Sequence, residues 1–349
     1  MFPTRPQRGD FTGVPHDGER DPWDADLSRE LPRVGPRRAP GMFGAVPEPE
    51  PPASIVPGAG PADDADDEPE EVQFVEVRRQ LSLAIAGFSA LLAIGLIVGA
   101  QSTGPDARLP YAIVIFGVQL LFVLAWTMAV QPPAPTAVGI VCAAAAGVAD
   151  YAAITADEPG LAPLAYAAAG GFVVAVLGQL LSRVGWQRVK DSLGPTLMIV
   201  AGVVAYACLL VLTRQPIGAQ TVLVCLAAAG VALVVARVTD AGYAKPRLAP
   251  QVPRGAAGIV LGAMLGTLAA AALGSFLVLP FDPAKGAVLG VVTAALAVLV
   301  DLAVNYSEAG RSMAGEVPTF WLARHMQGPL GAFAVAAPAG YAMATFFLS

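Results

Sequence analysis

The run LSLAIAGFSALLAIGLIVGA, residues 81–100, contains no charged side chain and follows closely after Arg78 and Arg79. Such a run matches the ~20 residues that an α-helix needs to cross a hydrocarbon core of ~30 Å. Eight more apolar segments follow, at about 111–130, 136–154, 161–181, 195–213, 221–236, 257–279, 287–304 and 330–348. A lipid-exposed backbone must satisfy its own hydrogen bonds, and no alternating barrel pattern is present. The sequence therefore predicts an all-α, polytopic transmembrane helix bundle of about nine spans.

Composition agrees with a membrane protein. The chain of 349 residues is 55% hydrophobic and only 14% charged, with a mean hydropathy of +0.61, which is far more apolar than a soluble domain. The formal net charge of −6 arises largely from an acidic cluster within residues 63–71, and no nucleic-acid-binding surface is visible. Cys142, Cys208 and Cys225 lie inside apolar runs, so neither a disulfide framework nor a metal-binding pair of cysteines is indicated.

The chain divides near residue 72. Residues 1–72 are rich in Pro, Gly and charged residues, and they contain too few large apolar groups to offset the entropy of ordering. We expect a disordered N-terminal tail without a signal peptide, because no apolar region follows the first charges. Residues 73–349 are expected to form the transmembrane domain.

Basic residues of the short loops predict the orientation. With a cytoplasmic N-terminus, eleven basic residues lie inside and three outside. The inside set is Arg78, Arg79, Arg183, Arg188, Lys190, Arg237, Lys245, Arg247, Arg254, Arg311 and Arg324, and the outside set is Arg108, Arg214 and Lys285. We therefore expect a multi-pass protein of the inner (cytoplasmic) membrane.

Polar features converge on the cytoplasmic side. The segment VTDAGYAKPRLAPQVPRG (238–255) is predicted to be a charged loop, and residues 305–329 a long loop that contains Arg311 and His325. Asp301 lies near the cytoplasmic end of the eighth span, where an acid is costly unless it is paired, hydrated or bound to a cation. Asp150, near the outer end of the third span, is interpreted as an interfacial residue.

Acids beside basic groups at a membrane surface suit phosphate chemistry. Asp oxygens bind Mg²⁺, the metal bridges phosphate oxygens, and Lys or Arg neutralises charge on a transferring group. The same basic residues also fit simple binding of anionic lipid by positive-inside loops.

The order of motifs resembles the C-terminal half of the phosphatidate cytidylyltransferases (CDP-diacylglycerol synthases) over about residues 237–349. The motif residues are TDAGYA (239–244), KPRLAPQVPRG (245–255), VDLAV (300–304), the loop histidine His325, and AAPAGYA (336–342). The resemblance implies that Asp240 and Asp301 hold Mg²⁺ and that both, with His325, belong to the catalytic site. It further implies phosphate binding by Lys245, Arg247, Arg254 and Arg311, with phosphatidate and CTP as substrates.

Several family positions differ in this chain. The family's Lys-Asp has no clear counterpart, Met326 and Gln327 replace two glycines after the histidine, and an Asp-Arg-x-Asp region reads GPLGAFA (328–334). A cytidylyl transfer needs those metal ligands and basic groups, so we expect a diverged relative with a partly lost site.

Three functions stay open. The first is an active lipid cytidylyltransferase. The second is a non-catalytic relative with a lipid-headgroup or regulatory role. The third is an unrelated membrane transporter or scaffold. Membrane lipids are expected partners of each, and a homo-oligomer or a membrane protein partner is compatible with all three.

Overall fold

The computed structural model describes residues 77–102, 108–182, 185–316 and 320–348. These residues form nine α-helices: α1 (Arg79–Gln101), α2 (Leu109–Val130), α3 (Pro135–Thr155), α4 (Ala162–Leu181), α5 (Trp186–Thr213), α6 (Gly218–Gly242), α7 (Ala256–Gly274), α8 (Pro283–Met313) and α9 (Trp321–Met343). A short π-helical stretch, η1 (Ala344–Leu348), continues α9. Each of the nine helices is long and apolar enough to cross a membrane, and the described residues contain no strand. The predicted all-α bundle of nine spans is confirmed, whereas the predicted tail, 1–72, lies outside the described residues.

Local sequence explains where several helices begin. Pro occupies the first or second helical position of α2, α3, α4 and α8, where its missing N–H costs nothing and its fixed φ suits the helix. Before α8, the Asp282 carboxylate accepts a hydrogen bond from the Lys285 backbone N–H at 2.7 Å, which is a standard N-cap interaction.

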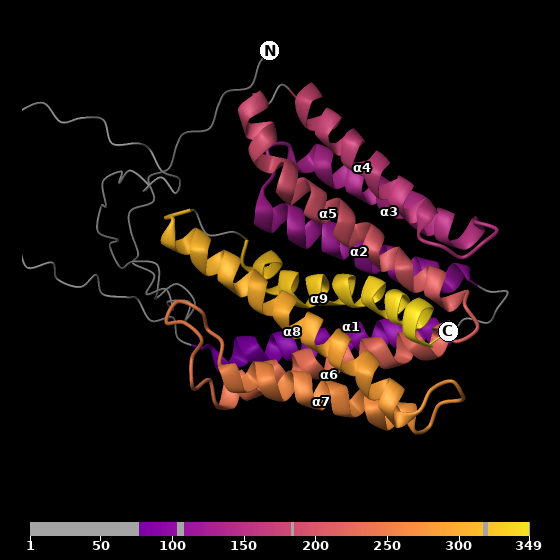
Figure 1. The fold of residues 1–349 in the computed structure, drawn as a ribbon. Coiled ribbons are helices and arrows are strands. Elements are labelled where there is room, and N and C mark those ends of the chain that lie inside the picture. Colours follow the sequence, from indigo (N-terminus) through magenta and orange to yellow (C-terminus); the bar gives the residue numbers. More distant parts are fainter. Residues whose placement is uncertain (1–76, 103–107, 183–184, 317–319, 349) are drawn as a thin grey trace, which may run out of the picture. The chain divides into compact units, whose positions relative to one another are not determined.

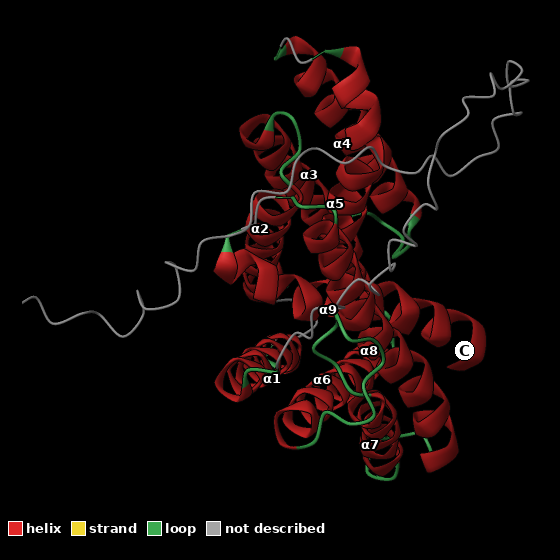
Figure 2. Cartoon of the chain, turned by 90° about the vertical axis from the view of Figure 1, so that its left-hand side faces the viewer, coloured by secondary structure: helices red, strands yellow, loops and turns green. Residues whose placement is uncertain are grey.

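The helices pack as two groups joined by α9. Helices α2–α5 lie together on one side, and α1, α6, α7 and α8 lie together on the other (Figures 1 and 2). Between them, α9 contacts α2 and α5 of the first group and α1, α6 and α8 of the second. One hydrogen bond illustrates the connection, because the Tyr206 hydroxyl of α5 donates to the backbone carbonyl of Leu330 on α9 at 2.6 Å.

Small residues set the close packing of α6 against α7. An added Cβ at Gly262 would lie 2.5 Å from the Ala232 carbonyl oxygen, and one at Gly266 would lie 2.5 Å from that of Ala228. The two glycines are one helical turn apart on α7, so they let its backbone rest on the carbonyl oxygens of α6. This contact brings the start of α7 against the end of α6, where the candidate site lies.

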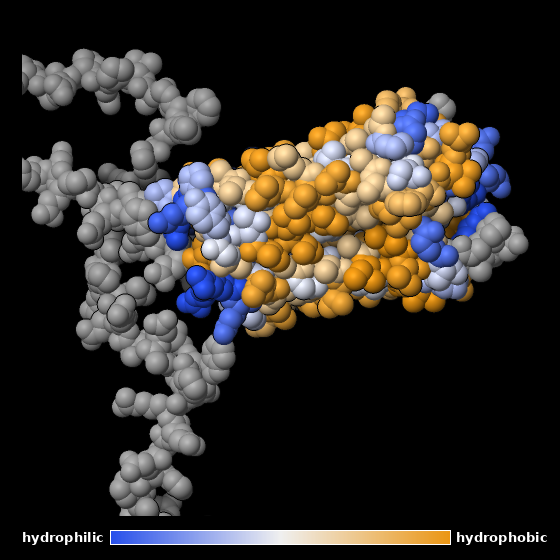
Figure 3. All heavy atoms as spheres, turned by 90° about the horizontal axis from the view of Figure 1, so that it is seen from below, coloured by the Kyte–Doolittle hydropathy of each residue, from blue (hydrophilic) through white to orange (hydrophobic). Residues whose placement is uncertain are grey.

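An apolar belt surrounds the bundle. Hydrophobic residues cover its side in Figure 3, and hydrophilic residues gather at the two ends. Leu91, Ile140 and Leu268, from three different helices, each leave more than half of their surface exposed. Such residues match lipid chains better than water, so the chain is a multi-pass membrane protein of the helical-bundle type.

Two predicted loop boundaries are wrong. Helix α6 continues to Gly242, so Asp240 is helical and only 243–255 connects α6 to α7. Helix α8 continues to Met313 and α9 begins at Trp321, so Arg311 and His325 lie on helices rather than in a long loop. Hydropathy marks where an apolar segment ends, whereas a helix with good formers such as Ala, Glu, Arg and Met continues into the polar zone.

Candidate functional site

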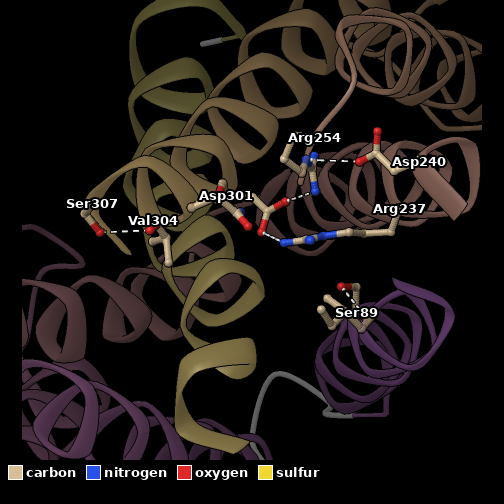
Figure 4. Close-up of polar contacts among 9 residues, drawn as sticks. Ser89, Arg237, Asp240, Arg254, Asp301, Val304 and Ser307 are labelled. Atoms are coloured by element: carbon tan, nitrogen blue, oxygen red, sulfur yellow. Dashed lines mark hydrogen bonds and ion pairs between the residues drawn. The ribbon is translucent and has the colours of Figure 1, made fainter. Parts of the chain in front are cut away.

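Four charged side chains meet at the end of the bundle that is predicted to be cytoplasmic. Arg237 and Asp240 come from the last turns of α6, Arg254 from the segment just before α7, and Asp301 from α8. Figure 4 shows that Arg254 lies between the two carboxylates and that Arg237 reaches Asp301 from another direction. These four residues are called the Arg–Asp cluster below.

The contacts of the cluster form a linear chain. The Asp240 Oδ2 atom lies 3.1 Å from Nε of Arg254, whose Nη1 lies 2.6 Å from Asp301 Oδ2. The other oxygen of Asp301, Oδ1, accepts a hydrogen bond from Nη2 of Arg237 at 2.5 Å. Negative and positive side chains therefore alternate along this chain of contacts, from Asp240 through Arg254 and Asp301 to Arg237.

The cluster is buried and formally neutral. Exposed fractions are 6% for Arg237, 2% for Asp240 and 0% for both Arg254 and Asp301. Removing four charges from water costs several kcal/mol per ion, and good pairing geometry must offset that cost. With two acids and two arginines in contact, each carboxylate has a cation beside it.

Backbone groups fix the positions of both carboxylates. The Gly255 N–H donates to Asp240 Oδ1 at 2.9 Å, and the 243–255 segment folds back on itself through a bridge between Arg247 and Gly255. A Cβ at Gly258 would lie 2.6 Å from Asp240 Oδ1, and one at Gly328 would overlap Asp301 Oδ1. Glycine at these two places lets the backbones of α7 and α9 pass directly against the acids.

The structure brings together three of the predicted site residues, namely Asp240, Arg254 and Asp301. Lys245 is exposed and Arg247 is half-buried on the segment between α6 and α7. Arg311 donates instead to the Ala129 carbonyl at the end of α2, at 2.5 Å.

His325 is half-buried on α9, and its ring meets the edge of Trp321 with the ring centroids 5.4 Å apart. Among the described residues, no hydrogen bond or ion pair joins His325 to the cluster. The next residue back, Arg324, forms an ion pair with Glu308 of α8. The catalytic role implied for His325 stays a prediction.

In the structure, the oxygens of the cluster face arginines and a backbone N–H rather than an open metal position. Both oxygens of Asp301 are bound to arginines, and those of Asp240 face the Gly255 N–H and Arg254. A magnesium ion would have to displace a guanidinium group to gain Asp301 as a ligand, whereas Asp240 Oδ2 accepts no hydrogen bond and only faces Arg254 Nε at 3.1 Å. The described residues also contain no group of three or more His, Cys, Asp or Glu placed to bind a metal. The expectations of Mg²⁺ and CTP stay predictions.

Arg237 is the member of the Arg–Asp cluster that the sequence does not predict as a site residue. In the sequence it reads as one of the positive-inside residues, although it lies three positions before Asp240 in an otherwise apolar helix. Residues three apart share a helix face, so a basic residue at that spacing from a candidate acid was the available signal.

A third buried acid lies in the other helix group. Asp150 of α3 is only 5% exposed, and its Oδ1 atom accepts a hydrogen bond from Nε2 of Gln119 on α2 at 2.9 Å. The interpretation of Asp150 as an interfacial residue is wrong, because its side chain is buried inside the group and is hydrogen-bonded to Gln119 of α2 rather than open to water.

Comparison of the chain with protein-family models, with curated proteins and with solved structures gives no match. The resemblance to the phosphatidate cytidylyltransferases thus rests on the motif residues alone.

Proposed function

We propose that this protein is a non-catalytic membrane protein that binds anionic, phosphate-bearing lipid headgroups at the end predicted to be cytoplasmic. One observation carries the proposal: among the residues that the structure describes at this end, charge is divided between a neutral buried cluster and a mainly basic surface. The Arg–Asp cluster then connects helices, and the surface residues meet the lipid.

In the described part of the chain, the exposed charge at this end is mainly positive. Its described exposed basic residues, called the basic end below, are Arg78, Arg79, Arg188, Lys190 and Lys245. Asp191 and Glu316 are the exposed acids of the same described part, since Asp240 and Asp301 are buried and Glu308 is paired with Arg324. Each Lys or Arg near an anionic membrane surface contributes about 1 kcal/mol of attraction.

Aromatic side chains accompany the basic residues. Trp186, Tyr243, Phe320 and Trp321 are each more than half exposed near this end of the helices. Lys190 lies over the Trp186 ring, with Nζ 5.6 Å from the ring centroid. Trp and Tyr favour the headgroup level of a bilayer, which supports the proposal that the basic end lies at the depth of lipid phosphates.

The contacts of Asp301 argue against cytidylyl transfer. Catalysis by the mechanism that the resemblance implies needs this carboxylate as a metal ligand, but its two oxygens are bound to Arg237 and Arg254. Its burial leaves water and substrate no direct contact with it. The cluster fits a structural connection between α6, α7 and α8 better than a reaction centre.

The first experiment tests catalysis. Purified protein is incubated with phosphatidate, labelled CTP and Mg²⁺ beside Asp301→Asn and Asp240→Asn variants, and an active phosphatidate cytidylyltransferase serves as the positive control. We expect no CDP-diacylglycerol. Product from the wild-type protein that both substitutions abolish would overturn the non-catalytic proposal.

The second experiment tests lipid binding. Titration of the protein in detergent with phosphatidate, followed by native mass spectrometry, measures the affinity, and phosphatidylcholine is the neutral control. The triple variant Arg188→Ala, Lys190→Ala and Lys245→Ala should lose about 3 kcal/mol, or roughly 100-fold in affinity. Lys285→Ala, at the opposite end, is the matched control and should bind like the wild type. Equal binding by the triple variant and the control would refute the proposed site.

A further inference from the structure

The buried acid of the α2–α5 group, Asp150, carries an inference that is independent of lipid binding. We propose that Asp150 and Gln119 form a binding site for one monovalent cation, a proton or a sodium ion, inside the α2–α5 group. The proposal rests on the contacts, the depth and the charge surroundings of these two residues.

The hydrogen bonds of Gln119 fix its orientation. Its Nε2 atom donates to Asp150 Oδ1 at 2.9 Å and to the Val203 carbonyl of α5 at 3.1 Å. Both amide hydrogens of Gln119 are therefore used. The amide cannot be turned over, because Oε1 would then face two other acceptor oxygens. Gln119 is fully buried, so three helices hold this amide in one position.

Two oxygen atoms at the site are left without a donor. Oδ2 of Asp150 and Oε1 of Gln119 are buried and have no hydrogen-bond partner among the described residues. Carboxylate and amide oxygens are hard ligands that suit a small cation, and a carboxylate oxygen also accepts a proton. The site thus has free acceptors and one neutral donor group.

Asp150 lies within the apolar zone. It precedes the end of α3 at Thr155 by five residues, or about 7.5 Å at ~1.5 Å per residue. Gln119 follows the start of α2 at Leu109 by ten residues, or about 15 Å. The two helices run in opposite directions, so the polar contact is separated from the outer surface by one to three helical turns.

The surrounding helices offer no charged partner. Apart from Asp150, the described helices α2, α3 and α4 contain no Asp, Glu, Lys, Arg or His. The charged residues of α5 all lie in its first two turns. The last of them, Asp191, lies about 18 Å along the helix from Val203, the α5 residue that Gln119 contacts. The buried titratable side chains of these helices are hydroxyls and thiols, namely Tyr111, Cys142, Tyr206 and Cys208.

Two arginines near the outer end of α3 are bound elsewhere. Arg214 donates to the carbonyl oxygens of Ala153 and Ala156, at 2.9 and 2.5 Å, and Arg108 donates to that of Ile154 at 3.4 Å. Among the described residues, Asp150 takes part in no ion pair.

An isolated carboxylate is very costly in this environment. Transfer of an unpaired ionised carboxylate into an apolar medium costs far more than one hydrogen bond returns. A single positive charge removes that cost, because it matches the one negative charge of the site. A divalent ion would leave an excess charge in the same apolar surroundings, so the site is suited to a monovalent cation.

The test uses the full-length protein in detergent and separates the two cations. Infrared spectra at neutral pH are compared between the wild type and Asp150→Asn, which keeps the side-chain shape. A bound proton gives a protonated carboxylic acid band that disappears in the variant. A bound sodium ion instead gives a saturable rise in melting temperature with sodium chloride over choline chloride, and this rise is lost in the variant.

Asp157→Asn is the matched control. Asp157 is exposed in the segment between α3 and α4, and its substitution should leave both signals unchanged. The wild-type signals can be measured even if Asp150→Asn fails to fold. Absence from the wild type of both the protonated acid band and the sodium-dependent shift would overturn the proposal, as would persistence of the observed signal in a folded Asp150→Asn protein.

Discussion

Arg254 is the residue on which the Arg–Asp cluster depends most, and its replacement by methionine gives the sharpest test of the geometry. Methionine keeps much of the length and volume of the side chain and removes its charge and all five N–H donors. Arg254→Met leaves Asp240 without its cation and Asp301 with Arg237 alone. The buried cluster then carries one net negative charge.

The expected cost follows from burial. Removing one partner from a buried ion pair costs about 3–5 kcal/mol, because the remaining charge is left uncompensated. Arg254 is fully buried and contacts two acids, so Arg254→Met belongs in that range. The folding equilibrium should change by roughly two to three and a half orders of magnitude.

Two double variants test the order of contacts within the cluster. Arg254→Met with Asp240→Asn leaves the 2.5 Å contact of Arg237 with Asp301 intact, so it should recover most of the lost stability. Arg254→Met with Asp301→Asn leaves Arg237 and Asp240, which make no ion pair with each other in the described structure, and it should recover less.

Unfolding by SDS in mixed micelles, followed by far-UV circular dichroism, measures the free energies. Wild-type stability in Arg254→Met would refute the structural role of the cluster. Equal recovery by the two double variants would refute the proposed order of contacts.

Three further substitutions, with Gly87→Ala as a control, test other contacts by the same assay. Gly328→Ala should cost about 1–3 kcal/mol because its Cβ would overlap the Asp301 carboxylate, whereas Gly87→Ala on α1, with nothing within 4 Å, should be neutral or slightly stabilising. Arg214→Ala should cost about 1–2 kcal/mol because the guanidinium binds carbonyl oxygens at the end of α3, and unchanged stability would rule out this cap. Gln179→Leu should cost about 0.6–2 kcal/mol because it removes hydrogen bonds to two hydroxyls of α5, and a gain in stability would contradict the structure.

Hydropathy alone predicts the nine helices of the described chain, because the cost of an unpaired backbone in lipid leaves few alternatives. It does not predict their ends. The first turns of α5, from Trp186, and the last turns of α8, up to Met313, are polar helix that a hydropathy window assigns to loops. Helix propensity and tertiary packing decide those boundaries.

The candidate site is predicted only in part. Asp240 and Asp301 can be recognised from the sequence, because each is an acid in or beside an apolar span, where a charge is costly. Their partners depend on how α6, α7 and α8 pack, and sequence spacing within one helix carries no such information. Arg254 therefore looks like an ordinary positive-inside residue in the sequence, whereas in the structure it lies fully buried between two helices.

The position of α9 has a consequence for biogenesis. Every other described helix leaves the ribosome before α9, yet α9 supplies most of the packing between the two helix groups. Until it inserts, the Tyr206 hydroxyl lacks its Leu330 acceptor, and the side of Asp301 that Gly328 covers stays open. Before α9 inserts, the two groups contact each other mainly between α1 and α2 and between α5 and α6, so most of their packing must wait for this helix. A nascent chain stalled before Trp321 would expose those polar surfaces to lipid, which makes it a natural target for membrane quality control.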